Sequence, residues 1–283
     1  MAVVVAAQGV KLVVTLALVA AGLAAVLHFK PGQKTVAEHA ISNLDADSVN
    51  SVRIEQPGKE RIELSRNEGK WRMSAPFSAR ADLGQAETVL ALLDAKSSVR
   101  YPANDLGRFD LEQPLATITL NDQQIRFGAI NPVSGEQYVA TDDHVYLIPA
   151  RHGGSLGGGA WASRKLLAEV EEPVRFEFPS FTAKKIDGEW RLSPRTELSQ
   201  QDFAIWVNRW RLAEGLAVAP ANRAEGTRFK ITLASGKEIP MLAIEKDAEF
   251  LIVRQDENLQ YRFSPAVAKP LVSAPVAATP QDS

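Results

Sequence analysis

The hydrophobic pattern divides the chain into an apolar N-terminal stretch and a longer stretch of alternating polarity. Leu12 to Phe29 contain no formally charged residue when His28 is neutral. From about residue 49 onward, apolar and polar residues alternate in short runs, which is typical of strands that bury one face. Two stretches with apolar residues at every third or fourth position interrupt these runs and predict amphipathic helices.

The N-terminal stretch is long enough to cross a membrane as a helix. A bilayer core of about 30 Å needs roughly 20 apolar residues, and Leu12 to Phe29 supply them when Val10 and the His28 end are counted at the edges. We therefore predict an uncleaved transmembrane anchor in residues 1–30. A cleaved signal peptide is the main alternative, because Lys11 and Gly22-Leu23-Ala24 fit its basic end and its cleavage site, although the apolar run exceeds the usual core of about 7 to 15 residues. A buried helix of a soluble fold is the other alternative.

The residues beside the anchor leave its orientation open. Lys11 precedes the apolar run and Lys30 and Lys34 follow it, so the positive-inside comparison is nearly balanced. A short tail before a large domain favours a single-pass protein of the inner membrane whose C-terminal region lies in the periplasm or outside. Pro31-Gly32 ends the predicted helix, and residues 31–48 are predicted to form a linker.

The remainder of the chain contains two similar series of short motifs. Val52-Arg53-Ile54-Glu55 resembles Val174-Arg175-Phe176-Glu177, and each opens an alternating run. Gly69-Lys70-Trp71-Arg72-Met73-Ser74 likewise resembles Gly188-Glu189-Trp190-Arg191-Leu192-Ser193. The glycine that opens each of these motifs is a hairpin-turn signal, because glycine readily adopts the positive φ that such turns require. The sequence thus predicts an internal repeat.

Each tryptophan strand precedes a predicted helix with a capping signal. Asp82 with Gln85 begins the first helix, and Ser199 with Asp202 begins the second. The apolar stripes of the two helices correspond position by position: Ala86, Val89, Leu90 and Leu93 in the first, and Phe203, Trp206, Val207 and Trp210 in the second. Later strands also match, namely Ile118-Thr119-Leu120 and Ile231-Thr232-Leu233.

These patterns predict an α+β protein, in which the N-terminal transmembrane helix is followed by two repeated units of antiparallel sheet with one main helix each. The predicted units are residues 49–167 and residues 168–272. Gly153 to Gly159 are predicted to form a flexible loop between the two series. Residues 273–283, which are rich in Ala, Pro and Val, are predicted to form a disordered tail.

Several short motifs of the first unit occur in a recognisable order: Gly69-Lys70-Trp71-Arg72-Met73 with Pro76, Leu90 to Leu93, Leu106 to Pro114, Ile125 to Gly128, Gln137-Tyr138-Val139, Val145 to Ile148, and Arg164-Lys165-Leu166-Leu167. On these motifs the first unit resembles the bacterial envelope domain of unknown function DUF4340, over roughly residues 49–167, and the second unit looks like a diverged copy. The family usually has Tyr-Gly where this chain has Arg108-Phe109-Asp110. Members are commonly membrane-anchored and are often encoded with ABC-type transport components of the gliding-motility kind, so the resemblance implies such a partner. It supplies no catalytic residues.

Composition and charge exclude several functions. The chain has 283 residues, of which 45% are hydrophobic and 23% are charged, and these are ordinary values for a globular protein. The net charge of -2 and the scattered basic residues do not favour nucleic-acid binding. The absence of cysteine excludes disulfides, thiol nucleophiles and thiolate metal sites.

The remaining motifs give no support to catalysis, a metal or a cofactor. The four histidines lack the i, i+4 spacing of a helical metal pair, and Asp142-Asp143-His144 fits a hairpin turn better than a ligand set. The glycine-rich loop lacks the Gly-Lys-Ser/Thr ending of a P-loop, and no serine has the Gly-x-Ser-x-Gly setting of a hydrolase. Glu169, Glu171 and Glu172 are interpreted as a solvated acidic patch.

Tryptophan and arginine supply the candidate partner-binding residues. Trp71 and Trp190 are predicted to anchor the core. The second helix combines aromatic residues with arginines, a composition also enriched at interfaces, so its tryptophans are either core or interface. The candidates are Trp206, Arg209, Trp210 and Arg211.

These features together predict a membrane-anchored, non-catalytic accessory or structural subunit of a bacterial envelope assembly. Its expected partners are the membrane and another envelope protein, with an ABC-type permease as the candidate that the resemblance implies. An extracytoplasmic module that binds a ligand, peptide or glycan is the alternative, and an envelope hydrolase is the third hypothesis.

Overall fold

The computed structural model describes residues 19–22, 24, 38–157, 159–222, 225–246 and 248–277. The chain divides into two compact units, Met1–Glu38 and His39–Ser283. In the first unit, Val19, Ala20, Ala21, Gly22 and Ala24 are helical, and the rest of the predicted anchor lies outside the described residues. No helix within the described ranges is long and apolar enough to cross a membrane.

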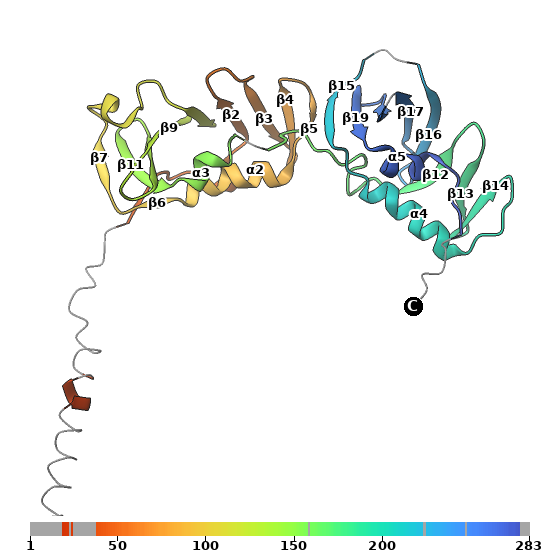
Figure 1. The fold of residues 1–283 in the computed structure, drawn as a ribbon, viewed down its shortest axis with the longest axis horizontal. Coiled ribbons are helices and arrows are strands. Elements are labelled where there is room, and N and C mark those ends of the chain that lie inside the picture. The colour runs from red at the N-terminus through yellow and green to blue at the C-terminus, as the bar shows by residue number, and fades with distance from the viewer. Residues whose placement is uncertain are drawn as a thin grey trace, which may run out of the picture. The chain divides into compact units, whose positions relative to one another are not determined.

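Antiparallel strands dominate the second unit from its first residue (Figure 1). Its first part contains the strands β1 (His39–Ala40), β2 (Ser51–Glu55), β3 (Ile62–Asn67), β4 (Lys70–Ala75), β5 (Ala79–Arg80), β6 (Lys96–Ser97), β7 (Arg100–Pro102), β8 (Ala116–Leu120), β9 (Gln123–Ile130), β10 (Glu136–Ala140) and β11 (His144–Pro149). The helices of this part are α2 (Leu83–Leu90), α3 (Arg151–Gly154) and the 3₁₀ helices η1 (Ala46–Ser48), η2 (Ala91–Asp94) and η3 (Leu106–Phe109).

The later part of the unit repeats this kind of element order. Its strands are β12 (Pro173–Glu177), β13 (Thr182–Ile186), β14 (Glu189–Ser193), β15 (Ala217–Pro220), β16 (Thr227–Leu233), β17 (Glu238–Lys246), β18 (Glu249–Arg254) and β19 (Leu259–Phe263). Its helices are α4 (Gln200–Leu212) and α5 (Pro265–Val272).

The strands form two large sheets and one short two-stranded sheet. The first large sheet has the order β5-β4-β3-β2-β8-β9-β10-β11-β7, and the second has the order β14-β13-β12-β16-β17-β18-β19-β15. Apart from β5, the two orders correspond strand for strand, and β4 with Trp71 takes the same place as β14 with Trp190. The described fold is therefore rich in sheet with few helices, an α+β arrangement.

The predicted turns and helix starts are present. Glu68 and Gly69 have positive φ before Trp71, and Asp187 and Gly188 have positive φ before Trp190. The Asp82 side chain accepts a hydrogen bond from the backbone N–H of Gln85 at the start of α2. A full capping box between Ser199 and Asp202 begins α4.

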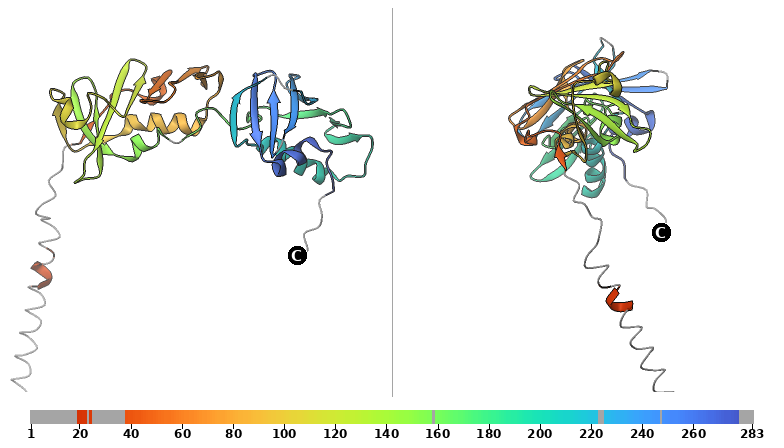
Figure 2. Two further views of the ribbon diagram at one scale, coloured as in Figure 1. Left: turned by 45° about the horizontal axis from the view of Figure 1, so that its top comes forward. Right: turned by 90° about the vertical axis from the view of Figure 1, so that its left-hand side faces the viewer.

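The helices cover one face of each sheet and complete one continuous apolar core, whose parts beneath α2 and beneath α4 and α5 we call the first core and the second core. Figure 2 shows α2 along one face of the first sheet, and α4 and α5 along one face of the second. The first core is mostly aliphatic, with the buried residues Val52, Ile54, Leu64, Met73, Val89, Leu92, Ile118 and Leu120. The second is aromatic, with the buried residues Phe176, Phe178, Trp190, Phe203, Trp206, Trp210 and Phe229. Trp71 and Trp190 are both buried, as predicted.

The opposite face of the first sheet is partly covered by the segment between β7 and β8. Leu111 from this segment packs with Ala140 and Val145 of the sheet. A Cβ atom on Gly128 would lie 2.1 Å from the carbonyl oxygen of Phe109, so glycine is required where this segment crosses β9. The corresponding connection in the second sheet, residues 221–226, is shorter, and the outer apolar cluster there consists of Leu242, Ile244 and Val253.

Two predicted segments, the linker and the glycine-rich loop, differ from the structure. The predicted linker, residues 31–48, is ordered from His39, where β1 pairs with β6 and Ile41 is buried. The glycine-rich loop predicted as flexible contains the turn of α3, and Gly153 lies so close to Gln137 that a Cβ atom would be 2.0 Å from its Oε1. Close packing, which composition does not reveal, explains these differences.

The predicted disordered tail also departs from the structure. Pro275 is buried, and the backbone oxygen of Ser273 accepts a hydrogen bond from the Trp206 indole. The segment from Ser273 to Pro275 therefore packs against α4, while residues 278–283 lie outside the described part of the chain. Apolar Ala, Pro and Val residues can order a short segment when a groove is available to bury them.

Candidate functional site

The outward side of α4 presents apolar side chains to solvent. Ile205 is 39% exposed and Leu212 is 71% exposed. They are seven residues apart, and Asn208 lies between them, so all three lie along one stripe of the helix. Arg209 and Arg211, which are exposed, flank this stripe on its two sides. We call Ile205, Asn208, Arg209, Arg211 and Leu212 the α4 surface.

Two of the four predicted partner-binding residues are in the core instead. Trp206 and Trp210 are buried against Phe176, with ring centroids 4.5 Å and 5.4 Å from the Phe176 ring. The reason is helical periodicity, because positions 203, 206 and 210 face the sheet while positions 205, 208 and 212 face solvent. Arg209 and Arg211 are on the solvent side, as a partner-binding role requires.

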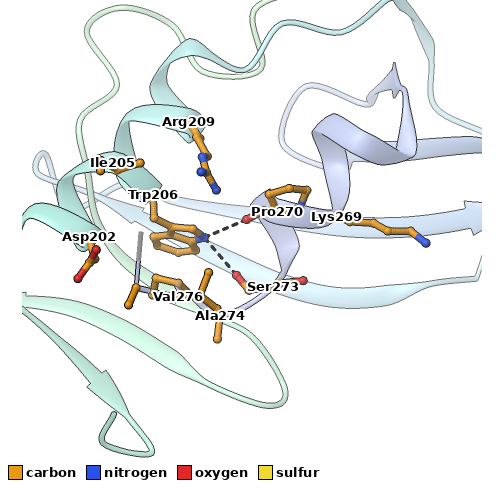
Figure 3. Close-up of a pocket in the computed structure, with 11 residues that line it drawn as sticks. Asp202, Ile205, Trp206, Arg209, Lys269, Pro270, Ser273, Ala274 and Val276 are labelled. Atoms are coloured by element: carbon orange, nitrogen blue, oxygen red, sulfur yellow. Dashed lines mark hydrogen bonds between the residues drawn. The ribbon is translucent and has the colours of Figure 1, made fainter. Parts of the chain in front are cut away.

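A hollow lies on one side of the α4 surface, between α4 and the segment after α5 (Figure 3). Its cavity volume is about 400 Å³. The Trp206 indole Nε1 donates to the backbone oxygens of Pro270 and Ser273, both at 3.1 Å, and so fixes this segment to the helix. Figure 3 shows Ile205 and Arg209 on α4 and Lys269 on α5 around the same hollow.

A second hollow lies on the other side of α4, toward β13 and β14. Its cavity volume is about 480 Å³, and Ile205 lines both hollows. Arg211 lines this second hollow, together with Trp190 of β14 and Lys185 of β13. The α4 surface is therefore a ridge with a depression on either side, and each depression has one of the two arginines at its border.

A buried polar network is the other concentration of chemically active groups. The side chain of Arg254 in β18 is 0% exposed, and each of its five N–H groups has an acceptor. Glu171 accepts two hydrogen bonds at 2.7 Å and 2.9 Å, and Asp256 accepts two at 2.8 Å and 3.1 Å. The backbone oxygen of Leu166 accepts the fifth at 2.9 Å.

Arg80 of β5 joins the same network from the first large sheet. It donates to the hydroxyl of Tyr261 at 2.9 Å and to the backbone oxygen of Lys165 at 2.6 Å. Its Nε lies 3.0 Å from Glu257, an ion pair without hydrogen-bond geometry. The Tyr261 hydroxyl donates to Glu257 at 3.0 Å. The network thus links β5, the segment before β12, and β18 and β19.

The pKa shifts in this network have identifiable causes. Burial raises the pKa of Glu171, but hydrogen bonds from Arg254 and from the Ala168 backbone outweigh burial and hold this pKa below its usual value. Burial also raises the pKa of Asp256, but hydrogen bonds from Arg254 and Lys237 outweigh burial and hold this pKa below its usual value. Burial raises the pKa of Tyr261 to about 12. The acids are therefore ionised and the phenol is neutral at physiological pH.

This network has the charge balance of a structural joint. Arg80, Lys237 and Arg254 face Glu171, Asp256 and Glu257, so three positive groups meet three negative ones. A general acid or base needs a pKa near the working pH, whereas the pKa values of Glu171 and Asp256 are shifted away from it. The network can hold chain segments together, and its charges are already paired.

The other predicted chemical groups lie apart. Asp142 and Asp143 occupy the turn between β10 and β11, as predicted, and His144 begins β11. Burial, followed by the charge of Arg151, lowers the pKa of His152. Within the described ranges, no group of three His, Asp or Glu residues is placed to hold a metal ion.

The interpretation of the acidic residues before β12 was partly wrong. Glu169 and Glu172 are exposed, as a solvated patch requires, but the Glu171 side chain is only 13% exposed because it binds Arg254. The sequence contained a signal for this site. Arg254 follows Phe250 and Ile252 at intervals of two, so it occupies the buried face of β18. An arginine that shares the buried face of a strand with apolar residues indicates an internal ion pair, because charged side chains are almost never fully buried unless they are paired.

Comparison with known families identifies one match. The model of the domain of unknown function DUF4340 matches residues 88–236, more than half of the chain. The match begins within α2 and ends after β16, so it covers parts of both large sheets, whereas the sequence motifs placed the resemblance in residues 49–167. No curated protein and no solved structure gives a significant match. The chain belongs to the DUF4340 family.

Proposed function

We propose that this protein is a non-catalytic subunit of a bacterial envelope assembly and that it binds another envelope protein through the α4 surface. The observation that supports this proposal is the exposed apolar stripe of Ile205 and Leu212 on α4, in which Ile205 lies between two hollows. Exposed apolar side chains that gather on one face of a rigid element mark a candidate protein-binding site. The aromatic core beneath α4 supplies the rigidity.

The proposed location is the inner membrane, with residues 10–29 as a single-pass anchor and the large unit on the periplasmic side. The length and apolar composition of this segment support the proposal. An ABC-type permease is the proposed partner because members of the family are often encoded with such transport components. An anchored subunit would meet a membrane partner at high effective concentration, so a modest interface would suffice.

We also propose that residues 49–167 and residues 168–272 are two copies of one ancestral unit. The matching strand orders of the two large sheets support this. The copies then differ in function: the aliphatic first copy serves as a scaffold, and the second copy, with its longer helix α4, provides the binding surface.

Site-specific photo-crosslinking in native membranes tests the proposed function. A photoreactive residue replaces Leu212 in the full chain, and a second variant has the same residue in place of Val133, which is 93% exposed in the turn between β9 and β10. We expect a stoichiometric adduct with an integral membrane protein from position 212 and none from position 133. Equal labelling at both positions, or none at 212, would contradict the proposal.

A further inference from the structure

We propose that the partner segment that docks on the α4 surface is an acidic amphipathic helix, whose apolar stripe lies on Ile205 and Leu212 and whose carboxylates bind Arg209 and Arg211. This inference rests on the proposed function and adds the chemistry of the partner. It follows from the arrangement of charge around the ridge.

Within the described part of the chain, the two arginines have no side-chain partners. Neither Arg209 nor Arg211 forms an ion pair or a side-chain hydrogen bond with another residue that the structure describes, although ion pairs are frequent on the rest of this unit. Their place in the last turns of α4 is favourable for the helix dipole. The dipole alone does not require one arginine on each side of an exposed apolar stripe, whereas a partner with acidic flanks does.

The neighbouring carboxylates are already occupied. The Asp202 carboxylate accepts hydrogen bonds from the backbone and the hydroxyl of Ser199 in the capping box. Glu172 lies 3.8 Å from Lys185, and Glu245 lies 2.8 Å from Lys269. The surroundings of the ridge therefore present a net positive charge to an incoming surface, and acidic groups complement it.

This charge distribution argues against a second copy of the chain as the occupant. A symmetric pair of α4 helices would bring four arginines to one interface, and Asp202 is the acidic residue that α4 itself offers. Because the capping box already uses the Asp202 carboxylate, a second copy would leave the arginines poorly neutralised.

The shape of the site favours a helix over an extended peptide. An apolar stripe flanked on each side by one cation is the arrangement found where helices pair, with apolar seam residues and opposite charges beside them. The two hollows are separated by the Ile205 ridge, so large side chains at i and i+3 or i+4 of a partner helix can enter one on each side.

Carbodiimide coupling in native membranes tests this chemistry. The full chain is given the substitutions Arg209→Lys and Arg211→Lys, which keep the charge and supply amines that carbodiimide joins to a contacting carboxylate with loss of water. The control is Arg191→Lys, because Arg191 is exposed on β14 outside the α4 surface. We expect coupling from positions 209 and 211 to Asp or Glu residues on the two flanks of the partner helix's apolar stripe, and none from position 191.

Charge reversal supplies the second measurement. Arg209→Glu with Arg211→Glu should lower the photo-adduct from position 212 by at least about tenfold, since like charges at an interface cost more than the roughly 1.4 kcal/mol of a tenfold change. Arg191→Glu should leave the adduct unchanged, and circular dichroism checks that each variant is folded.

The outcomes separate this inference from the proposed function. A photo-adduct at 212 that persists after charge reversal, without carbodiimide coupling at 209 or 211, would overturn the acidic helix and leave the binding role intact. Coupling to a second copy of this chain would also overturn it. Absence of any adduct at 212 would overturn the proposed function itself, and the inference with it.

Discussion

Val139 and Arg254 occupy the same position in the two large sheets. Val139 of β10 lies opposite Phe127 and Tyr146, and Arg254 of β18 lies opposite Met241 and Leu259. Both side chains are fully buried, yet one is aliphatic and the other is a guanidinium.

The difference shows what a buried charge requires in this fold. Val139 needs only its apolar neighbours, whereas Arg254 is surrounded by two bidentate carboxylates and a backbone oxygen. Burial of an unpaired guanidinium would be prohibitively unfavourable. The buried charge occurs where Arg80 of the first large sheet binds Tyr261 of the second and where the Leu166 backbone oxygen accepts a hydrogen bond from Arg254. The second sheet therefore uses this charge to bind neighbouring segments.

Replacing Arg254 by valine should cause the largest loss of stability. Arg254→Val makes the two positions alike but leaves Glu171 and Asp256 without their main partner, and we expect a loss of about 3–5 kcal/mol in the free energy of unfolding. Urea denaturation of the full chain in detergent measures this. Arg262→Val is the control, because the Arg262–Glu249 pair is exposed and should contribute about 0–1 kcal/mol. Equal losses of unfolding free energy in both variants would show that the buried network stabilises the fold no more than an exposed ion pair does.

Acid should weaken the same joint. The folded pKa values of Glu171 and Asp256 lie below their usual values, so the unfolded chain binds more protons as the pH falls. Their stabilisation is fully present above the ordinary carboxyl pKa of about 4 and is lost as the pH falls through the folded values. Urea midpoints between about pH 6 and about pH 3 should therefore fall more steeply for the unsubstituted chain than for Glu171→Gln with Asp256→Asn. Equal pH dependence of the urea midpoint in the two chains would contradict the role of Glu171 and Asp256 in this pH dependence.

Much of the fold could be predicted from the sequence because it depends on local signals. The glycine turns before Trp71 and Trp190, and the caps of α2 and α4, follow from residues within four positions of one another. The strand pattern also predicted which tryptophans anchor the sheets.

The remaining features depend on contacts between distant residues. Glu171 and Arg254 are 83 positions apart, and neither position alone shows that they meet. The periodicity of α4 is visible in the sequence, but composition alone does not distinguish a core role from an interface role for Trp206 and Trp210, because contact with the sheet decides which face is buried. The ordered tail similarly depends on a groove that α4 and α5 form together.

The outer faces of the two sheets offer a smaller test. Gly128 lies beneath the segment before β8, whereas the matching position in β17 is Leu242. Gly128→Ala should cost about 1–3 kcal/mol, because the new methyl group would collide with the Phe109 carbonyl and with Leu111. Gly154→Ala is the matched control, since no atom lies within 4 Å of its Cβ position. Equal stability of the two variants would show that the segment does not pack closely on β9.

The smallest expected difference in stability is between variants of the two tryptophans beneath the α4 surface. Trp206→Phe and Trp210→Phe remove similar ring volumes from one aromatic core, so their cavity costs should largely cancel when the two variants are compared. The indole N–H groups differ. Trp206 Nε1 donates to the oxygens of Pro270 and Ser273, while the buried Trp210 Nε1 has no hydrogen-bond partner in the described part of the chain.

Trp206→Phe should therefore cost about 0.5–1.5 kcal/mol more than Trp210→Phe, the usual net contribution of a hydrogen bond. The lost bonds also fix the segment after α5, so limited proteolysis should cleave near Ser273 faster in Trp206→Phe than in Trp210→Phe. The Trp210 variant removes an unpartnered donor along with ring volume, which offsets part of its own cavity cost. A larger loss in Trp210→Phe, with equal cleavage of both variants, would mean that ring packing rather than the indole bonds orders this edge of the α4 surface.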